Sequence, residues 1–355
     1  MASSQLPAEP VIYLVEPFGG SVRRQNPNMP HVFWDDAAVT RGDGVFESIL
    51  VRAGAPVNLD KHLARFARSA ALMGLPEPGR EHWTRATEEA VADFCRERGG
   101  EAGVAVEAKC TWTLTRGRET TGVPTAWITV RPLPKEVLRQ RERGVSVVTT
   151  PRGYTVDADV PWMREGAKTL NYALTMAALR WAGEQGADDI IYVDPDTGRV
   201  LEGATSSVLM VKKGGRMRTP APGAGVMAGT TQAAIFERAE RAGWKCKAED
   251  IYLSELFKAE SVWLVSSTRI AARVKRLDGT KLPAPGNEPE IRQLIESALL
   301  SPRRASARRT CRAPSRRRRR ARPPSPGCCW ASGRTAACRG RGRRGRSPWR
   351  WWTRW

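Results

Sequence analysis

Hydrophobic positions in the first 150 residues follow two patterns. Apolar residues repeat at helical spacing over residues 59–73 and 83–98, and glycine follows each segment. Two-residue alternation predicts strands over residues 11–15, 40–51, 104–115, 125–133 and 144–150, with a polar loop over residues 19–30. These elements predict an α/β N-terminal domain spanning residues 1–150.

The next 150 residues mix the same two patterns in another order. Helices are predicted over residues 169–185, 230–242 and 285–300. Strands are predicted over residues 189–193, 199–203, 207–212, 261–266 and 271–277. Residues 151–166 have few regular signals, so we expect them to connect two domains. The fold class is therefore α/β, with a second domain over residues 151–300.

The pattern stops after Leu300. Residues 301–355 contain 19 of the 58 basic residues and no acid, so the rest of the chain carries 39 basic and 37 acidic residues. The net charge of +21 thus belongs almost wholly to this Arg-rich C-terminal tail, which we predict to be disordered. One interpretation is a basic arm for nucleic acid or an acidic partner. We favour a frameshift product of a GC-rich gene.

Cysteine and histidine give no metal or disulfide pattern. Outside the tail, Cys95, Cys110 and Cys246 are scattered, and the chain's three histidines are far apart. The first residues lack a signal-peptide pattern, and no apolar stretch is long enough to span a membrane. We therefore expect a cytoplasmic protein without a metal.

Lys168 lies in a segment suited to covalent catalysis. It belongs to Gly-Ala-Lys-Thr-Leu-Asn-Tyr, residues 166–172, at the start of a predicted helix, and Glu202 ends a later strand. A lysine can form a Schiff base with the aldehyde of pyridoxal phosphate, and a carboxylate can hold the pyridine nitrogen protonated. A phosphate-loop interpretation fails, because that motif needs glycine directly before the lysine, where this chain has Ala167.

These segments resemble the class IV (fold type IV) aminotransferases. That family includes branched-chain and D-amino-acid transaminases and 4-amino-4-deoxychorismate lyase. The resemblance extends from Val11 to Gly279 over five segments in the family's order. It implies a two-domain D-amino-acid aminotransferase-like fold, pyridoxal 5'-phosphate as cofactor and a small-molecule amino substrate. It also implies a homodimer, since a second subunit helps to close the family's cleft.

The resemblance also assigns roles to residues of this chain. Lys168 is the catalytic lysine, and Glu202 contacts the pyridine nitrogen. Ser207 stands where most relatives have Asn, which leaves the role of Glu202 unaffected. The remaining implied cofactor-binding residues are Arg65, Tyr172, Gly229, Thr230, Thr231, Ser267 and Thr268, several of them suited to a phosphate at a helix N-terminus.

Substrate contacts are implied less directly. Phe46 lies in Arg-Gly-Asp-Gly-Val-Phe-Glu, a segment close to the family's pattern, and could line the substrate pocket. Arg116 and Arg118, on the turn after Thr115, are the candidates for binding the substrate carboxylate. Arg269 belongs to Ser-Ser-Thr-Arg, residues 266–269, which resembles a family segment on the phosphate and substrate side.

Two enzymatic functions remain open. The segments around Lys168 and Phe46 resemble the lyase and D-amino-acid transaminase branch, and the Leu-Val-Ser-Ser-Thr-Arg stretch is similar to lyase-like proteins of actinobacteria. We favour the lyase, with a transaminase of D-amino or branched-chain amino acids as the alternative. A nucleic-acid-binding protein is a remote alternative that depends on the tail alone.

Overall fold

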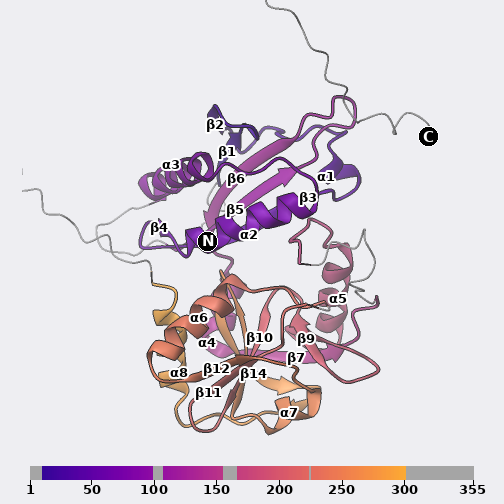
Figure 1. Cartoon of the computed structure of the whole chain (residues 1–355), viewed down its shortest axis with the longest axis vertical. Coiled ribbons are helices and arrows are strands. Elements are labelled where there is room, and N and C mark those ends of the chain that lie inside the picture. Colours follow the sequence, from indigo (N-terminus) through magenta and orange to yellow (C-terminus); the bar gives the residue numbers. More distant parts are fainter. Residues whose placement is uncertain (1–9, 99–106, 155–165, 224, 301–355) are drawn as a thin grey trace, which may run out of the picture. The chain divides into compact units, whose positions relative to one another are not determined.

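The computed structural model describes residues 10–98, 107–154, 166–223 and 225–300, and these contain two β-sheets (Figure 1). All neighbouring strands of the first sheet are antiparallel. Their order is β2 (Val22–Gln25), β1 (Val11–Val15), β6 (Thr125–Pro132), β5 (Ala108–Thr115), β3 (Gly44–Arg52) and β4 (Ala55–Pro56).

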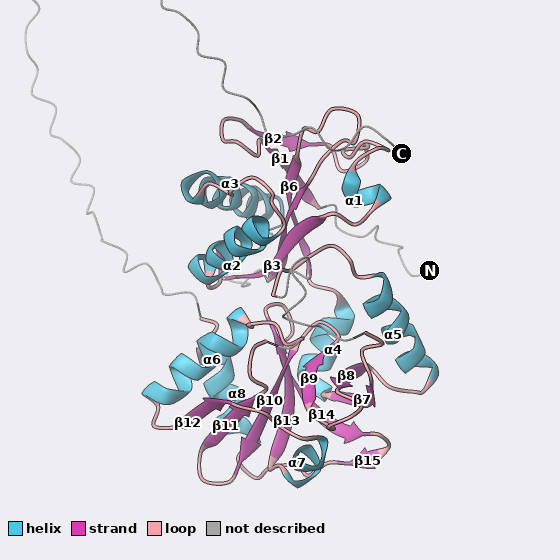
Figure 2. Cartoon of the chain, turned by 45° about the vertical axis from the view of Figure 1, so that its right-hand side comes forward, coloured by secondary structure: helices cyan, strands magenta, loops and turns pink. Residues whose placement is uncertain are grey.

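Helices α2 (Leu59–Leu72) and α3 (Arg80–Arg98) cover one face of this sheet (Figure 2). The rings of Phe66, Trp83 and Trp112 are fully buried between helices and sheet, with centroids 4.8 to 5.6 Å apart. Because side chains alternate along a strand, Trp112 on this face leaves Lys109, Thr111 and Thr113 of β5 on the other.

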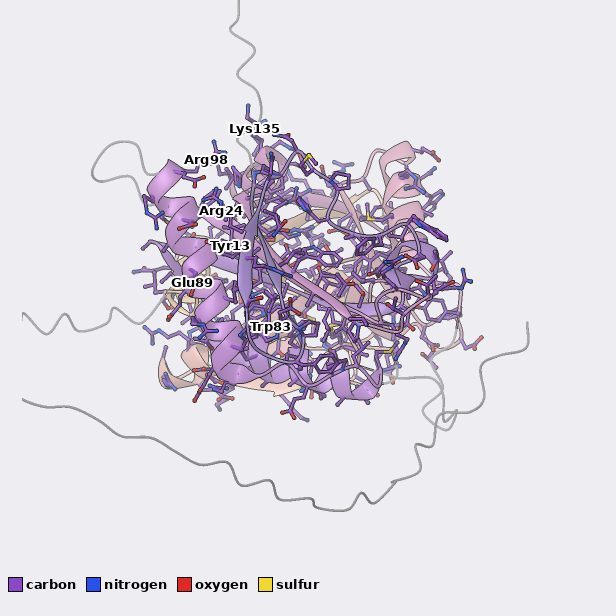
Figure 3. The ribbon with its side chains drawn as sticks, turned by 90° about the horizontal axis from the view of Figure 1, so that it is seen from above. Tyr13, Arg24, Trp83, Glu89, Arg98 and Lys135 are labelled. Carbon is purple, nitrogen blue, oxygen red and sulfur yellow. The ribbon has the colours of Figure 1, made fainter. Side chains whose placement is uncertain are left out.

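Polar contacts also hold α3 against the outer strands. Figure 3 shows Tyr13 and Arg24 beside this helix. The Tyr13 hydroxyl donates to Asp93 at 2.6 Å, and Arg24 pairs with Asp93 and Glu97. The first sheet and its two helices therefore form two layers that pack against each other.

The second sheet is mixed, with parallel pairs at β11–β12, β14–β7 and β7–β8. Its order is β12 (Lys245–Ala248), β11 (Arg216–Thr219), β10 (Ser207–Lys212), β13 (Ser261–Ser266), β14 (Ile270–Leu277), β7 (Val145–Thr150), β8 (Asp189–Val193) and β9 (Val200–Gly203), and β15 (Thr280–Lys281) pairs with β14.

Five helices accompany this sheet: α4 (Lys135–Arg143), α5 (Ala173–Glu184), α6 (Thr230–Arg241), α7 (Leu253–Lys258) and α8 (Glu288–Ser297). Helices α6 and α8 pack together and cover β13 and β14, whereas α5 lies along β8. The two sheets with their helices confirm the α/β class. The division at residue 150 stays a prediction.

Several buried apolar strands were predicted well, whereas short or highly charged elements were missed. Strands β1, β8, β10 and β13 have the predicted bounds. Strands β2, β11 and β12 and helices α4 and α7 were not predicted, because each is short or highly charged and lacks a clear apolar period. Residues 37–40 form a short helix, α1 (Ala37–Thr40), so β3 begins at Gly44 and not at residue 40.

Two placements were wrong. We grouped residues 144–150 with the N-terminal strands, but β7 pairs with β8 and β14 in the second sheet. We also placed Lys168 at a helix start, whereas α5 begins at Ala173. Residue 168 lies in extended backbone instead, because Thr169 forms a bridge with Val45 of β3.

Some predictions fall outside the described residues: the disordered tail over 301–355, most of the connection over 155–165 and the start of the strand predicted at 104.

Candidate active site

A cavity of about 370 Å³ brings most of the predicted site residues together. Both sheets contribute to its wall. Its lining includes Phe46, Arg65, Lys168, Tyr172, Glu202, Gly229, Thr230, Thr231, Ser267, Thr268 and Arg269. Arg116 and Arg118 are absent from that lining.

Backbone pairing holds the Lys168 segment against the start of β3. The amide of Phe46 donates to the Lys168 carbonyl at 3.0 Å, and the amide of Leu170 donates to the Gly44 carbonyl at 2.9 Å. A Cβ at Gly44 would lie 2.7 Å from Leu170 Cδ1 and 2.8 Å from the Leu114 carbonyl oxygen. Glycine is therefore required at position 44 for the lysine segment to approach the sheet this closely.

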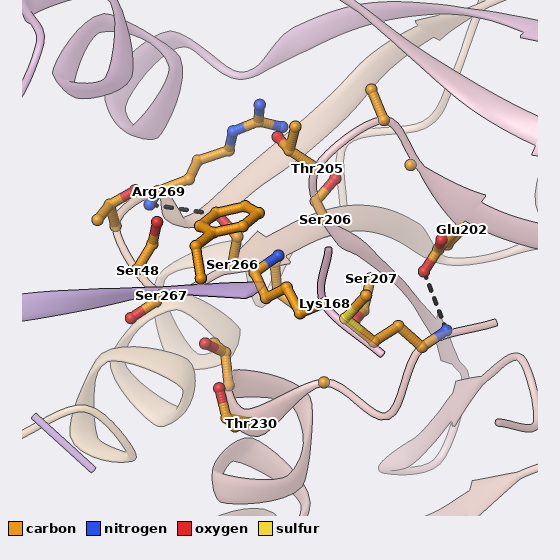
Figure 4. A pocket seen from close by; sticks show the side chains of 18 of the residues that line it. Ser48, Lys168, Glu202, Thr205, Ser206, Ser207, Thr230, Ser266, Ser267 and Arg269 are labelled. Carbon is orange, nitrogen blue, oxygen red and sulfur yellow. Dashed lines mark hydrogen bonds between the residues drawn. The ribbon is translucent and has the colours of Figure 1, made fainter. Parts of the chain in front are cut away.

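The Lys168 side chain enters the cavity beside two aromatic rings. Its Nζ lies 3.2 Å from the Tyr172 hydroxyl and 4.5 Å from the centroid of the Phe46 ring. Figure 4 shows Lys168 among the labelled side chains, with Ser267 and Arg269 on one side and Glu202 on the other. The amine is thus held between a hydroxyl that can exchange a proton with it and a ring face that attracts its charged form.

Glu202 is held in place by two partners. Its Oε1 accepts from Arg152 Nη2 at 2.8 Å, and its Oε2 accepts from the Met227 amide at 3.1 Å (Figure 4 shows the latter bond). The Arg152 guanidinium lies 5.0 Å from the centroid of Tyr192. Our sequence interpretation missed Arg152, because it follows a strand in a segment without a motif.

The start of α6 forms the polar end of the cavity. Gly229 is the N-cap, and no side chain caps the helix. The first amides of α6 therefore lack a capping partner and are available to an anion. A Cβ at Gly229 would lie 2.5 Å from Ser207 Oγ, so a side chain there would force the Ser207 hydroxyl or the turn to shift. The hydroxyls of the buried Thr230 and Thr231 stand at the same end.

Arg65 reaches this end through a buried ion pair. Its Nε and Nη2 donate to the two carboxylate oxygens of Glu47 at 2.7 and 2.8 Å, and Nη1 donates to the Ala228 carbonyl at 3.3 Å. Burial opposes ionisation of Glu47, yet Arg65 and His62 outweigh it and lower the pKa of Glu47 to about 2. The pair fixes the arginine beside the helix start.

His62 extends this network to Ser267. Its Nδ1 lies 2.7 Å from Glu47 Oε2, and its Nε2 lies 3.4 Å from Ser267 Oγ. Burial lowers the pKa of His62, so the ring is neutral, with the proton on Nδ1 facing the carboxylate. Ser267 Oγ also accepts from the Leu50 amide at 3.1 Å, which orients this cavity hydroxyl.

The three arginines implied on the substrate side already have acidic partners. Arg269 donates to Asp189 at 2.6 Å, and both side chains are buried. Arg116 donates to Asp43 at 2.6 Å and Arg118 to Asp35 at 2.9 Å, both outside the cavity lining. Only Arg269 among them lies at the cavity.

Lys109 of β5 is a second lysine in the cavity lining, and sequence interpretation missed it. Burial, with added repulsion from Arg131 and Lys168, lowers its pKa to about 8. The only sequence signal was a lysine inside a predicted hydrophobic strand.

No group of three or more potential metal ligands occurs among the described residues. The described helices also include none long and apolar enough to cross a membrane.

Comparisons with known proteins agree with this geometry. A family model described as amino-transferase class IV matches residues 44–277. The chain belongs to the class IV aminotransferases. As a member of that family it is a pyridoxal-phosphate enzyme, which confirms the enzyme class and the cofactor expected from the sequence.

Individual relatives cover nearly all of the described chain. The chain is 41% identical over 285 residues, 78% of its length and 96% of the relative's, to a bifunctional aminodeoxychorismate lyase / D-amino acid transaminase of Mycobacterium tuberculosis. It is 25% identical over 271 residues to a D-alanine aminotransferase of Bacillus licheniformis, covering 75% of this chain and 91% of that one.

A solved structure supports the same fold. A hypothetical aminotransferase from Mycobacterium tuberculosis in its PLP-bound form matches with a TM-score of 0.75 and 39% identity, over 81% of this chain and 99% of that one. The fold type IV class is therefore confirmed.

The residues at the cavity fit pyridoxal phosphate. Lys168 can hold an aldehyde, Glu202 can face a pyridine nitrogen, and the uncapped start of α6 can accept a phosphate. Ser206, which is 8% exposed, belongs to the cavity lining, and its buried Oγ has no hydrogen-bond partner among the described residues. An unpaired buried hydroxyl is costly, so it indicates a position where a polar ligand binds.

Proposed function

We propose that this enzyme binds pyridoxal phosphate through Lys168 and acts as a 4-amino-4-deoxychorismate lyase. The observation that supports it is a lysine Nζ paired with a tyrosine hydroxyl at 3.2 Å, in a cavity that also holds a fixed carboxylate and an uncapped helix start. The bifunctional relative, at 41% identity, favours this branch of the family.

Each end of the cavity has a separate task in this proposal. The start of α6, with Thr230, Thr231 and Arg65, binds the phosphate. Glu202, held by Arg152 and the Met227 amide, binds the protonated pyridine nitrogen. Pyridoxal phosphate, when bound, supplies an aldehyde for the substrate amine and a ring that accepts electrons.

Lys168 moves the proton. Its Nζ removes the proton from the amine-bearing carbon of the substrate, and the Tyr172 hydroxyl keeps the amine oriented. The bond from the neighbouring carbon to the enolpyruvyl oxygen then breaks, pyruvate leaves, and the six-membered ring becomes aromatic 4-aminobenzoate. No amino acceptor is consumed.

A D-amino-acid transaminase is the second candidate, because the relatives that match include both activities in their names. In that reaction Lys168 would again move the proton of the amine-bearing carbon, and a 2-oxo acid would be needed as amino acceptor to restore the enzyme. The two functions therefore differ in their need for an acceptor.

The discriminating assay supplies 4-amino-4-deoxychorismate to the purified enzyme without any oxo acid. We expect 4-aminobenzoate and pyruvate in equal amounts. Turnover only with D-alanine and 2-oxoglutarate together would support the transaminase instead.

The cofactor lysine can be identified separately. Borohydride reduction should attach the cofactor to the peptide that contains Lys168, and Lys168→Ala should abolish both the visible absorbance and the attachment. A reduced cofactor on the peptide that contains Lys109 would overturn the assignment, since that lysine also lines the cavity.

A further inference from the structure

We propose that Lys109 binds the carboxylate of the substrate, a role that rests on the proposed function. None of the arginines suggested by the sequence is as well placed for it.

The register of the first sheet directs Lys109 toward the cavity. Cys110 and Trp112 of β5 are buried under α2 and α3, so Lys109 projects from the opposite face. On that face Leu50 of β3 stands directly opposite Lys109, and Ser48 opposite Thr111. Phe46 and Ser48, further along the same face of β3, line the cavity with Lys109.

Four cationic side chains line the cavity: Arg65, Lys109, Lys168 and Arg269. Glu47 occupies two nitrogens of Arg65, and Asp189 binds Arg269. Lys168 is committed to the cofactor in the proposed function. Lys109 has neither a hydrogen bond nor an ion pair with any described residue, so its whole ammonium is available to an incoming anion. Arg269 is already held by Asp189, although its buried Nε has no partner among the described residues.

The charges around Lys109 favour an anionic ligand. Arg131 faces it from β6, and Lys168 faces it across the cavity. Glu202 is the one acid in the cavity lining, and it is already paired with Arg152. A bound carboxylate would offset the repulsion among the three cations.

The lowered pKa of Lys109 is consistent with its position at the cavity beside other cations. Burial, followed by repulsion from Arg131 and Lys168, lowers its pKa to about 8. The group therefore remains mostly an ammonium at neutral pH, and a carboxylate beside it would stabilise that form.

Lys109→Met keeps an unbranched side chain as far as the ε atom and removes the charged amine. Because a hydrogen bond between charged groups contributes strongly to binding, we expect the KM for the carboxylate substrate that the wild type turns over, 4-amino-4-deoxychorismate or D-alanine, to rise about 10- to 100-fold. The kcat should change little, since the interaction is made equally in the ground state. Lys109→Arg should restore most of the affinity.

Arg131→Met is the matched control. It removes a neighbouring cation from the same sheet face, but Arg131 is exposed and does not line the cavity. We expect its KM to stay close to that of the wild type. An equal rise of KM in both variants would show that the loss of any nearby positive charge weakens substrate binding, and it would overturn the assignment.

A second measurement does not require turnover. Acetic anhydride modifies amines in their neutral form, so the modification of Lys109 can be followed by peptide mapping. Pyruvate should protect Lys109 in the cofactor-loaded enzyme, whereas acetone, which lacks the carboxylate, should not. Equal protection by both compounds, or by neither, would contradict the proposal.

The outcomes separate this proposal from the function on which it rests. An unchanged KM in Lys109→Met, with the cofactor still on Lys168, overturns the carboxylate role alone. A fall in kcat without a change in KM would indicate proton transfer by Lys109 and overturn it too. Cofactor missing from Lys168 in the wild type would refute the proposed function itself.

Discussion

The Glu202 carboxylate accepts hydrogen bonds from Arg152 and from the Met227 amide, so both of its oxygens are engaged and its direction is fixed. Arg152 is itself nearly buried and lies against the Tyr192 ring. A carboxylate fixed in this way can stabilise a positive charge on the pyridine nitrogen without reorganising during the reaction.

Replacing Glu202 with Gln should therefore separate binding from catalysis. We expect Glu202→Gln to retain the cofactor but to lose about 100-fold or more in kcat, because a neutral amide does not stabilise the charged ring. Absorbance of the bound cofactor measures its retention, and steady-state kinetics measure kcat. Turnover close to that of the wild type would assign the role to another group.

The buried Glu47 links three side chains, and its titration should appear in the stability of the protein. Its pKa is lowered from 4.5 to about 2, so it stabilises the fold above pH 4.5 and this contribution is lost as the pH falls toward 2. The pKa of His62 is lowered from 6.5 in the folded protein. As the pH falls below 6.5, the imidazole is therefore protonated in the unfolded chain before it is protonated in the fold, and stability declines.

We thus expect the free energy of unfolding to fall as the pH decreases from about 6.5, and again between 4.5 and 2. Glu47→Gln should flatten the lower part of this dependence. At neutral pH it should cost on the order of 3 kcal/mol, since Arg65 loses its buried partner. Urea denaturation across the pH range measures both effects. An unchanged profile would mean that Glu47 is not ionised in the fold.

At the scale of elements, the turn into α6 depends on the absence of a side chain at Gly229. Gly229→Ala would place a Cβ 2.5 Å from Ser207 Oγ and displace the start of the helix. We expect the dissociation constant for pyridoxal phosphate to rise about tenfold or more, as one or two charge-assisted hydrogen bonds are weakened. Equilibrium dialysis of the apoenzyme measures it.

Two further variants test whether the Ser207 contact causes the weaker cofactor binding of Gly229→Ala. The double variant Ser207→Ala and Gly229→Ala removes the clashing hydroxyl and should recover much of the affinity. Gly183→Ala, at a helical position with nothing within 4 Å of the added Cβ, should leave cofactor binding unchanged. A double variant as weak as the single one would show that backbone freedom, not the Ser207 contact, requires the glycine.

Sequence patterns predicted the elements of this fold more successfully than the partners of their side chains. Strands β8, β10 and β13 are mostly apolar and buried, so local composition specifies them. Lys168 and Glu202 were found because they belong to motifs. The Arg152 pairing with Glu202 joins residues 50 positions apart, and the Glu47–Arg65 pair forms across a helix–strand contact, so no local pattern could indicate either one.

The same dependence on tertiary contacts explains why the sequence did not reveal the partners of Arg116 and Arg118. Arg116 and Arg118 were chosen because relatives bind substrate with an arginine from this region, and no local pattern distinguished between them. Asp43 and Asp35 hold them away from the cavity lining of their own chain. Lys109 was missed because a single lysine in a strand gives no indication of the face on which it lies. That face depends on the register of β5 against β3, a tertiary property.

At the scale of the whole molecule, the exposed large apolar side chains of the described chain include two sets, one in the loops around Trp34 and one on α5. Phe33, Trp34 and Val123 are 55%, 77% and 57% exposed, in loops tied together by backbone bonds such as Glu119 to Asp35. On α5, Leu174 is 64% exposed and Trp181 40%. Exposed apolar side chains that gather into one patch are typical of contact surfaces with another protein.

We expect a second copy of this chain to cover these groups, which agrees with the homodimer implied by the family resemblance. Burying apolar area on both copies stabilises association by about 25 cal/mol per Å². Trp34→Glu combined with Leu174→Glu should therefore yield monomers in light scattering, because each charge would lose its hydration at the contact. Arg180→Glu, on the same helix, tests whether a changed charge alone is sufficient, and it should leave the dimer intact. A wild-type monomer that turns over substrate would contradict the expectation, and a double variant that remains dimeric would place the interface elsewhere on the chain.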